Sequence, residues 1–321
     1  MQFPSSAYSG YSKPEDVLRQ LLLIAEKRYG ERVHEVDFID STLAMERLYN
    51  MKKIIGLLAF IFLLFITSLR AYDHVFIIML ENAGFDAIVG DTADAPYINN
   101  ELIPQGTLYT QHYGVTHPSE PNYLALFSGS TQGVTTNKCI GTNGPFLGDN
   151  LYSRLTRSNF SCLGYMESMP LDGYLGCKSG LYVQKHNPFP FFSYPGRVPV
   201  SAWVVYSGPY SDSHSWPNLA WITPNLVDDM HKGATLAEKI SNGDSWLSVH
   251  LPPIISYCDN NNGLIILTMD EGPHNHIFTL LIGSGIEAGG INGIMFNHYN
   301  TLRTITDNFG VKAFVNVPPL F

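Results

Sequence analysis

Several short apolar segments of the chain have the pattern of buried strands. Polar and apolar residues do not alternate in them, and such continuous runs are typical of parallel strands that are covered on both faces of a sheet. The segments are residues 74–80, 201–206, 263–269 and 278–283.

Helical patterns lie between these apolar segments. Leu302 and Ile305 fall on one face of a helix that Gly310 can end. The helical segments are residues 121–127 and 301–310. Strands that alternate with helices predict a three-layer α/β/α sandwich around a mostly parallel central sheet. Residues 170–225 are richer in Pro, Gly, Tyr and Ser, which predicts long ordered loops around a site.

A positively charged and then apolar segment stands near the start of the chain. Two lysines precede an apolar run of 16 residues at 54–69, and Ala71 follows it. This order is typical of a secretory signal peptide, and the run is shorter than the roughly 20 residues of a membrane-spanning helix. The segment predicts export to the periplasm or the extracellular space.

Residues 1–50 precede this segment, which leaves two interpretations open. In the first, Met51 is the true start and residues 1–50 are an upstream extension of the gene model. In the second, residues 54–69 are a short signal anchor that keeps the protein at a membrane. We favour the first. The predicted organisation is an extension at 1–50 with an amphipathic helix at 14–30, a signal segment at 51–71 and one domain at 72–321.

The composition supports a large folded domain and argues against a nucleic-acid partner. Of the 321 residues, 45% are hydrophobic and 15% are charged, which is unlike a disordered chain. The formal net charge is −9, and no block rich in Lys and Arg occurs. A phosphodiester polymer is therefore a poor ligand candidate, whereas a small phosphoester is compatible. No protein partner is evident.

All four cysteines lie after the signal segment. An even number of cysteines in an exported chain predicts two disulfides and an oxidising compartment. Three connectivities are open, and four buried free thiols are the alternative. The cysteines are Cys139, Cys162, Cys177 and Cys258.

Two of the predicted strands run directly into acidic residues. Glu81 and Asn82 follow the first apolar segment. Asp270 and Glu271 follow the third. Ligands of open α/β sheets bind at the carboxyl ends of the strands, so adjacent parallel strands would bring these side chains together. Three carboxylates at one edge repel each other unless a cation neutralises them. The alternative is that each pair caps a following helix and faces water.

The candidate metal ligands are oxygen atoms. Such a set suits a hard divalent cation such as Mg²⁺, Ca²⁺ or Mn²⁺, whereas imidazoles nearby would favour Zn²⁺ or iron. The identity of the cation therefore stays open. The candidate ligands are Glu81, Asn82, Asp270, Glu271 and the hydroxyl of Ser119.

Ser119 lies at the predicted start of a helix. Pro121 fits the first turn because its missing N–H is harmless there. The helix dipole and the free backbone N–H groups favour an anion such as phosphate at this point. A metal lowers the pKa of a coordinated hydroxyl, so Ser119 is a candidate nucleophile, and Asn122 can donate a hydrogen bond to a phosphoryl oxygen. The simpler alternative is that Ser119 caps the helix and does nothing more.

Three histidines are candidates for charge stabilisation and proton transfer. His276 has the best position, six residues after Asp270 and just before the next apolar segment. The others are His186 and His231, and for each of the three a structural role is the alternative. No P-loop or G-x-S-x-G motif occurs around these residues, which argues against an NTPase or an α/β-hydrolase.

Seven stretches of the chain, taken in order, resemble a phosphoesterase family. This family includes bacterial and fungal acid phosphatases and, more distantly, the non-haemolytic phospholipases C, and it has an alkaline phosphatase-like α/β/α fold. The stretches are residues 77–90, 95–102, 116–129, 183–192, 222–233, 267–272 and 297–310.

The resemblance implies a double displacement through a phosphoserine-type intermediate that water hydrolyses, with Ser119 as the nucleophile. The metal ligands that it implies are Glu81, Asn82, Ser119, Asp270 and Glu271. Polar positions of the family's site are matched by Asn122, His186, His231 and His276.

Three residues depart from the family's motifs. Glu120 stands where a small or apolar residue is usual, and it places an acid beside the nucleophile. Met269 replaces a frequent aromatic residue, and Asn300 replaces a frequent serine. None of the three removes a candidate ligand.

The residues and the resemblance together predict an exported, metal-dependent hydrolase of phosphoric esters, an acid phosphatase acting on small monoesters. One alternative is a phospholipase C-like phosphodiesterase that acts on a phospholipid headgroup. Another is a non-catalytic exported binding protein with the same fold.

Overall fold

The computed structural model describes residues 19, 23, 27, 49, 52–53, 72–193, 198–211 and 213–321. The chain separates into two units, Met1–Leu69 and Arg70–Phe321, and the second carries the fold. Within the predicted helix at 14–30, the described residues Arg19, Leu23 and Lys27 are helical. The predicted signal segment at 54–69 lies outside the described residues. In the part of the chain that the structure describes, no helix is both long and apolar enough to cross a membrane.

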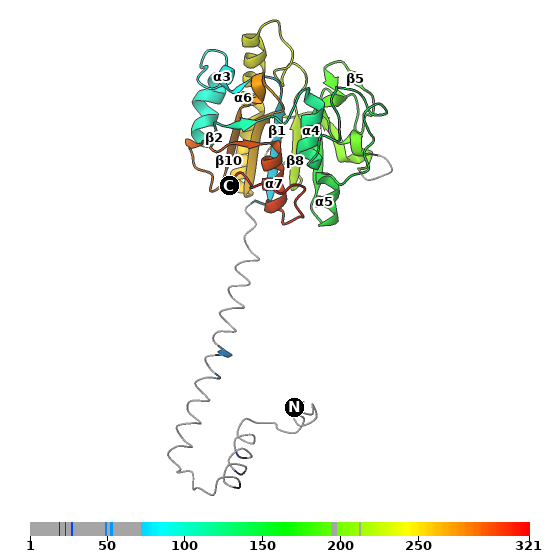
Figure 1. Cartoon of the computed structure of the whole chain (residues 1–321). Helices are drawn as coiled ribbons and strands as arrows, with labels where there is room; N and C mark the ends of the chain where they lie inside the picture. The colour runs from blue at the N-terminus through cyan, green and yellow to red at the C-terminus, as the bar shows by residue number, and fades with distance from the viewer. Residues whose placement is uncertain are drawn as a thin grey trace. The chain divides into compact units, whose positions relative to one another are not determined.

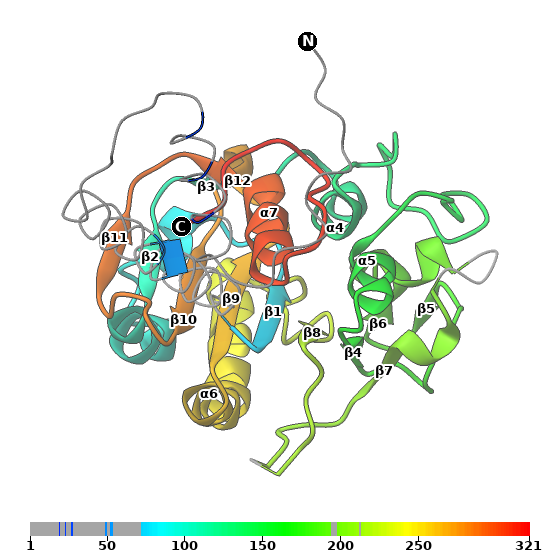
Figure 2. The ribbon, with the colours of Figure 1, turned by 90° about the horizontal axis from the view of Figure 1, so that it is seen from below.

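An eight-stranded sheet forms the centre of the second unit (Figure 1). Its strand order is β11-β2-β10-β9-β1-β8-β4-β7 (Figure 2). Its strands are β1 (His74–Leu80), β2 (Thr107–Tyr109), β4 (Cys162–Glu167), β7 (Trp203–Tyr206), β8 (Leu219–Thr223), β9 (Gly263–Met269), β10 (Thr279–Gly283) and β11 (Gly290–Asn292). Strand β1 pairs in parallel with β8 and β9. Strands β1 and β9 are buried almost throughout, as their apolar runs predicted.

Strand β10 differs from the prediction, because it is antiparallel to both of its neighbours, β9 and β2. The apolar run at 278–283 was expected to be one more parallel strand. A parallel neighbour needs a crossover of about a dozen residues or more, and only residues 270–278 separate β9 from β10. The chain therefore turns back, although β10 is buried like a parallel strand.

Helices cover both faces of the sheet. Figure 2 shows α4, α5 and α7 on one side and α6 on the other. The helices of the first face are α4 (Ser119–Ser128), α5 (Leu151–Arg157) and α7 (His298–Asn308), and those of the second are α3 (Phe85–Ile88), the π-helix η1 (Ile98–Leu102) and α6 (Leu236–Asn260). Successive residues of β1 enter opposite cores, as Ile77 and Ile78 do. The predicted α/β/α architecture is confirmed.

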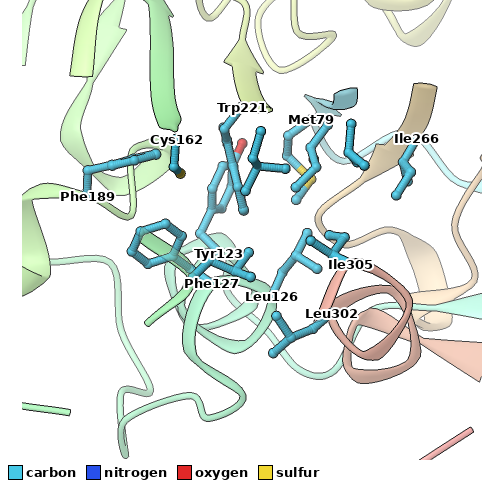
Figure 3. Close-up of a cluster of buried hydrophobic side chains, with 14 of the residues drawn as sticks. Met79, Tyr123, Leu126, Phe127, Cys162, Phe189, Trp221, Ile266, Leu302 and Ile305 are labelled. Carbon is cyan, nitrogen blue, oxygen red and sulfur yellow. The ribbon is translucent and has the colours of Figure 1, made fainter. Parts of the chain in front are cut away.

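The core under α4 and α7 is rich in aromatic side chains. Figure 3 shows Tyr123 and Phe127 of α4 next to Trp221 of β8, with Leu302 and Ile305 of α7 nearby. The ring of Phe127 meets that of Trp221 edge-on at 5.9 Å. This packing fixes α4, and with it the start of that helix, against the sheet.

Helix α6 was not predicted, although it is long. Pro252 and Pro253 lie inside it, and a proline in the interior of a segment normally indicates that a helix ends or kinks there. Gly243 also interrupts the helical pattern, but the fold requires it, because a Cβ at this position would come within 2.4 Å of Cγ of Met230. Helix α7 was predicted, and Gly310 follows its end with a left-handed φ of 61°.

The region at 170–225 contains loops, as expected, but also the strands β7 and β8. The sequence indicated β7 and missed β8, whose five residues contain an apolar run of only four. The remaining short elements are β3 (His112–Tyr113), β5 (Lys178–Ser179), β6 (Tyr182–Val183), β12 (Phe296–Asn297), η2 (Ile103–Gln105), η3 (Gln184–His186), η4 (Pro190–Phe192), η5 (Val200–Ala202) and η6 (Pro273–Asn275).

The prediction of two disulfides is half wrong. Cys139 and Cys177 form a disulfide. Cys162 and Cys258 are buried and free. They belong to the cores on opposite faces of the sheet, so the sheet itself separates them.

Candidate active site

The two acidic strand ends meet at one edge of the sheet. Strands β1 and β9 are adjacent, parallel and in register up to their last residues, so the residues that follow leave the sheet side by side. The backbone N–H of Asn82 donates to Oδ1 of Asp270 at 3.3 Å. Glu81 and Asp270 are 0% exposed, and Glu271 is 6% exposed. These carboxylates are buried, so they do not fit the alternative in which each pair caps a helix and faces water.

Helix α4 places Ser119 against the acidic residues. The Oγ atom lies 3.1 Å from Oε2 of Glu81 and 2.9 Å from Oε1 of Glu271. The helix begins at Ser119, immediately after Pro118, and Pro121 stands in its first turn. The hydroxyl therefore has carboxylate proton acceptors beside it and lies at the positive end of the helix dipole, where a phosphate is favoured.

The charge of the acidic cluster is not balanced by hydrogen bonds alone. Burial, and then the charges of Glu81 and Glu271, raise the pKa of Asp270 well above its ordinary value. Among the described residues, Oδ2 of Asp270 is buried and has no hydrogen-bond partner. A buried carboxylate in this state requires a proton or a cation. The cluster therefore fits a divalent cation.

Two imidazoles approach the carboxylate of Glu81. Nε2 of His186 lies 3.1 Å from Oε2 of Glu81, and Nδ1 of His231 lies 3.6 Å from the same oxygen. The donor atoms of the three residues lie within 4.8 Å of one another, a spacing that fits a metal ion. Burial would raise the pKa of Glu81, but the charge of His186 and hydrogen bonds with both histidines lower it overall. Nδ1 of His231 also contacts the side-chain amide of Asn82.

Asp229 connects these groups, and it was not among the predicted site residues. Its backbone carbonyl accepts from the N–H of Glu81 at 2.7 Å. Oδ1 accepts from the N–H of His231 at 2.8 Å, and Oδ2 lies 3.1 Å from Nδ1 of His186. A carboxylate on the far nitrogen of a histidine fixes the orientation of the ring, as around metal ligands. Asp229 precedes His231 by two residues, and this closeness was the only available signal.

Tyr123 is a second residue that sequence reasoning missed. Its hydroxyl donates to Oε1 of Glu81 at 2.5 Å, and its ring stacks on His186 with centroids 5.4 Å apart. Burial, and then the charge of Glu81, raise the pKa of Tyr123 well above its ordinary value, so the phenol keeps its proton. Tyr123 follows Ser119 by one helical turn, which places both side chains on the same face of α4.

His298 supports the cluster from α7. Its Nε2 donates to the backbone carbonyl of Asp270 at 2.6 Å. Burial lowers the pKa of His298 to about 4, which keeps the ring neutral at pH 7. On the other side, Nδ1 of His117 contacts Oε2 of Glu271, and the side chain of His117 is 55% exposed. His117 thus reaches from the buried cluster to solvent.

Asn122 lies close to Ser119, but its amide is engaged by the preceding turn. Oδ1 accepts from the N–H groups of Val115 at 2.8 Å and Thr116 at 3.1 Å. Nδ2 donates to the carbonyl groups of Thr116 at 2.7 Å and Pro118 at 3.3 Å. In this arrangement the side chain holds the turn that leads into Ser119.

His276 lies between two aromatic rings. Its centroid is 4.6 Å from that of Phe85 and 5.2 Å from that of Tyr113, and both pairs are stacked. Nε2 hydrogen-bonds to the carbonyl of Thr110 at 3.0 Å. The structure brings together Glu81, Asn82, Ser119, Asp270, Glu271, His186 and His231, whereas the side-chain contacts of His276 are with Phe85, Tyr113 and Thr110.

Comparison with known proteins relates the chain to phosphatases. The sequence pattern of the Phosphoesterase family matches residues 92–273, more than half of the chain. A phosphatidylinositol-3-phosphatase of Mycobacterium tuberculosis is 34% identical over 296 residues, which cover 86% of this chain and 94% of that protein. A phosphate-repressible acid phosphatase of Penicillium chrysogenum is 28% identical over 260 residues, which cover 76% of this chain and 60% of that protein. The chain thus spans less than two thirds of the fungal relative.

A solved structure supports the predicted fold. A protein of the alkaline phosphatase superfamily from Vibrio parahaemolyticus superimposes with a TM-score of 0.53 at 15% sequence identity. The match covers 75% of this chain and 67% of that one. The predicted alkaline phosphatase-like architecture is therefore confirmed at the level of the fold.

Replacement of Asp229 by Asn is expected to lower the pKa of His186. Burial alone lowers this pKa, whereas the charge of Glu81 and the hydrogen bond and charge of Asp229 raise it above its ordinary value. Without the charge of Asp229, the lowering of the His186 pKa by burial is opposed by Glu81 alone. An NMR titration of the His186 ring protons in chelator-treated protein measures the change. Asp228→Asn is the control, because Asp228 contacts Asn225 instead. An unchanged pKa in Asp229→Asn, or an equal fall in the control, contradicts this role.

Proposed function

The chain belongs to the Phosphoesterase family and is a hydrolase of phosphoric esters, and from this premise we propose that it is a metal-dependent phosphomonoesterase with Ser119 as its nucleophile. One observation carries the proposal. The Ser119 hydroxyl lies within hydrogen-bond distance of the buried carboxylates of Glu81 and Glu271 at the start of a helix. A serine that only capped the helix would not need buried carboxylates beside its hydroxyl.

The proposed reaction has two displacements. A neighbouring carboxylate accepts the hydroxyl proton while Oγ of Ser119 forms a bond to phosphorus. The bond between phosphorus and the substrate's alcohol oxygen breaks, and the alkoxide takes up a proton. Water then attacks the phosphoserine, the bond from Oγ to phosphorus breaks, and phosphate leaves as Oγ regains a proton. The positive end of α4 favours the anion in both steps.

A divalent cation would complete this site. When bound, it would lower the pKa of the serine hydroxyl and offset the charge of the phosphate. The unpaired buried oxygen of Asp270 supports its presence. Two imidazoles beside Glu81 widen the choice from Mg²⁺, Ca²⁺ or Mn²⁺ to Zn²⁺ or iron. The residues proposed to hold it are Glu81, Asn82, Ser119, Asp270 and Glu271, joined by His186 and His231.

The residues around Ser119 have distinct proposed roles. Asn122 holds the turn before the nucleophile and so orients it. Two histidines can donate the proton to the leaving alkoxide. His117 reaches from Glu271 to solvent, and His276 follows Glu271 by five residues, with its ring between Phe85 and Tyr113. Replacement of each by Gln identifies the donor, because loss of the true acid slows hydrolysis of alkyl phosphates more than that of aryl phosphates.

We assign phosphomonoesters as the substrate class. The curated relatives named above are phosphatases, and one of them acts on a phosphoinositide, in which a monoester is attached to a lipid headgroup. This chain is thus proposed to take a small phosphomonoester or a monoester on a phospholipid headgroup. A phospholipase C-like phosphodiesterase, which cleaves the diester instead, is the alternative.

We also propose that the protein is exported. The segment at 54–69 has the pattern of a signal peptide. The disulfide between Cys139 and Cys177 fits an oxidising compartment. Sequencing of the N-terminus of the protein from its own host is expected to show a first residue near Tyr72. A mature chain that retains residues 54–69 contradicts cleavage and favours the anchored form.

Replacement of Ser119 by Ala is expected to reduce turnover of p-nitrophenyl phosphate by at least ~10³-fold, because a nucleophile and its partners act as a unit. Ser128→Ala in the same helix is the control, since Ser128 bonds to the carbonyl of Leu124. The assay compares p-nitrophenyl phosphate with its phosphorylcholine ester at acidic and neutral pH.

The two substrates also separate the alternatives. Activity on the phosphorylcholine diester alone rules out the monoesterase and supports the phosphodiesterase. Retention of activity in Ser119→Ala rules out the serine as the nucleophile. Acid quenching of the wild-type reaction and mass spectrometry are expected to find phosphate on the peptide that contains Ser119.

A further inference from the structure

Glu120 departs from the family's motif, and the structure gives it a partner away from the acidic cluster. It follows Ser119 directly, and its side chain is 0% exposed. Oε2 accepts from the backbone N–H of Lys138 at 2.7 Å, and Oε1 accepts from Nδ2 of Asn143 at 2.8 Å. The N–H of Glu120 donates to Oδ1 of Asn137 at 3.0 Å. One residue of α4 thus holds a loop at three points.

The loop that Glu120 holds, residues 136–143, is also joined to the segment before His186. A disulfide links Cys139 of the loop to Cys177. The N–H of Ile140 donates to Oε1 of Gln184 at 2.8 Å. Gln184 in turn bonds through its own N–H to the carbonyl of Cys177 at 2.9 Å. Gln184 begins the turn η3, and His186 ends it.

These contacts form one path from the nucleophile to the histidine. It leads from Ser119 to Glu120, through the 136–143 loop, and on through the disulfide and Gln184 to His186. We propose that Glu120 is a positioning residue, which with this loop and the disulfide fixes Ser119 relative to His186. This inference rests on the proposed function for its kinetic test only.

The disulfide and the bond between Ile140 and Gln184 lie side by side, and both stand in series with the contacts of Glu120, which has a measurable consequence. Loss of the Glu120 carboxylate removes its bonds to Lys138 and Asn143 and leaves only the backbone bond to Asn137 between this residue and the loop, so a later loss of the disulfide has less left to loosen. Two independent structural defects would add instead. The stacking of Tyr123 on His186 remains in both cases, so the site is loosened and not dismantled.

The test replaces Glu120 by Gln. The amide NH₂ of Gln takes the place of one carboxylate oxygen, so one of the two hydrogen bonds from Lys138 and Asn143 loses its acceptor. Glu120→Gln is expected to lower kcat for p-nitrophenyl phosphate by about 10- to 100-fold with a smaller change in KM, because misplacement of reacting groups acts on the chemical step. Glu238→Gln is the matched control, since Glu238 accepts a backbone N–H from Ala234 at 2.7 Å on the surface.

The disulfide is then removed in both backgrounds. Cys139→Ser with Cys177→Ser is the first choice, and reduction of the folded protein at fixed metal concentration replaces it if that variant does not fold. Removal is expected to lower kcat of the wild type by several-fold and to lower kcat of Glu120→Gln by a clearly smaller factor. Fully additive losses, or no loss of kcat in Glu120→Gln, overturn the proposal.

Hydrogen exchange gives a readout that needs no activity. Faster exchange is expected at the amides of Lys138 and Ile140 in Glu120→Gln, and in the peptide that contains Gln184. Unchanged exchange at these amides contradicts the proposed path. Turnover that survives Ser119→Ala contradicts the proposed function instead, and the exchange measurement still decides on Glu120.

Discussion

Carboxylates that are removed from water cannot lie together unless their charge is neutralised, and this constraint governs the centre of the molecule. The pairing of β1 with β9 delivers Glu81 and Asp270 to the same point of the sheet edge, so their proximity follows from the backbone. Burial prevents water from screening them, and one oxygen of Asp270 has no partner among the described residues. The polar groups of the site can be understood as responses to this concentration of negative charge.

The surroundings hold the charged groups in place from several elements. Asp229 fixes Glu81, His186 and His231 by three separate contacts. His298 supports the backbone of Asp270 from α7. Because Glu81, His186, Asp229 and His298 are all buried, the cluster is part of the core and not a surface feature. A site built in this way has little freedom to rearrange, which suits the proposed role of Ser119 as a nucleophile that must meet phosphorus in one geometry.

The sequence predicted those parts of the site that depend on local pattern. Apolar runs that end in acidic pairs located Glu81 and Asp270, and a serine before Pro121 indicated the start of α4. It did not predict contacts that depend on distant segments, such as the bridge of Asp229 between two histidines. The features of the fold that were not predicted also depend on more than the local sequence pattern. The direction of β10 follows from the length of a connection, and α6 forms despite its prolines because its apolar face is buried. The two free cysteines, Cys162 and Cys258, are separated by the sheet.

The central claim is that the acidic cluster holds a divalent cation on which phosphoester hydrolysis depends. Metal analysis by mass spectrometry, coupled to turnover of p-nitrophenyl phosphate, tests it most directly. The protein purified without chelator is expected to carry at least about one equivalent of a divalent metal. Chelation should remove metal and activity together, and one metal should restore both; Asp270→Asn should bind it more weakly. Full turnover by protein from which all metal has been removed would contradict the account.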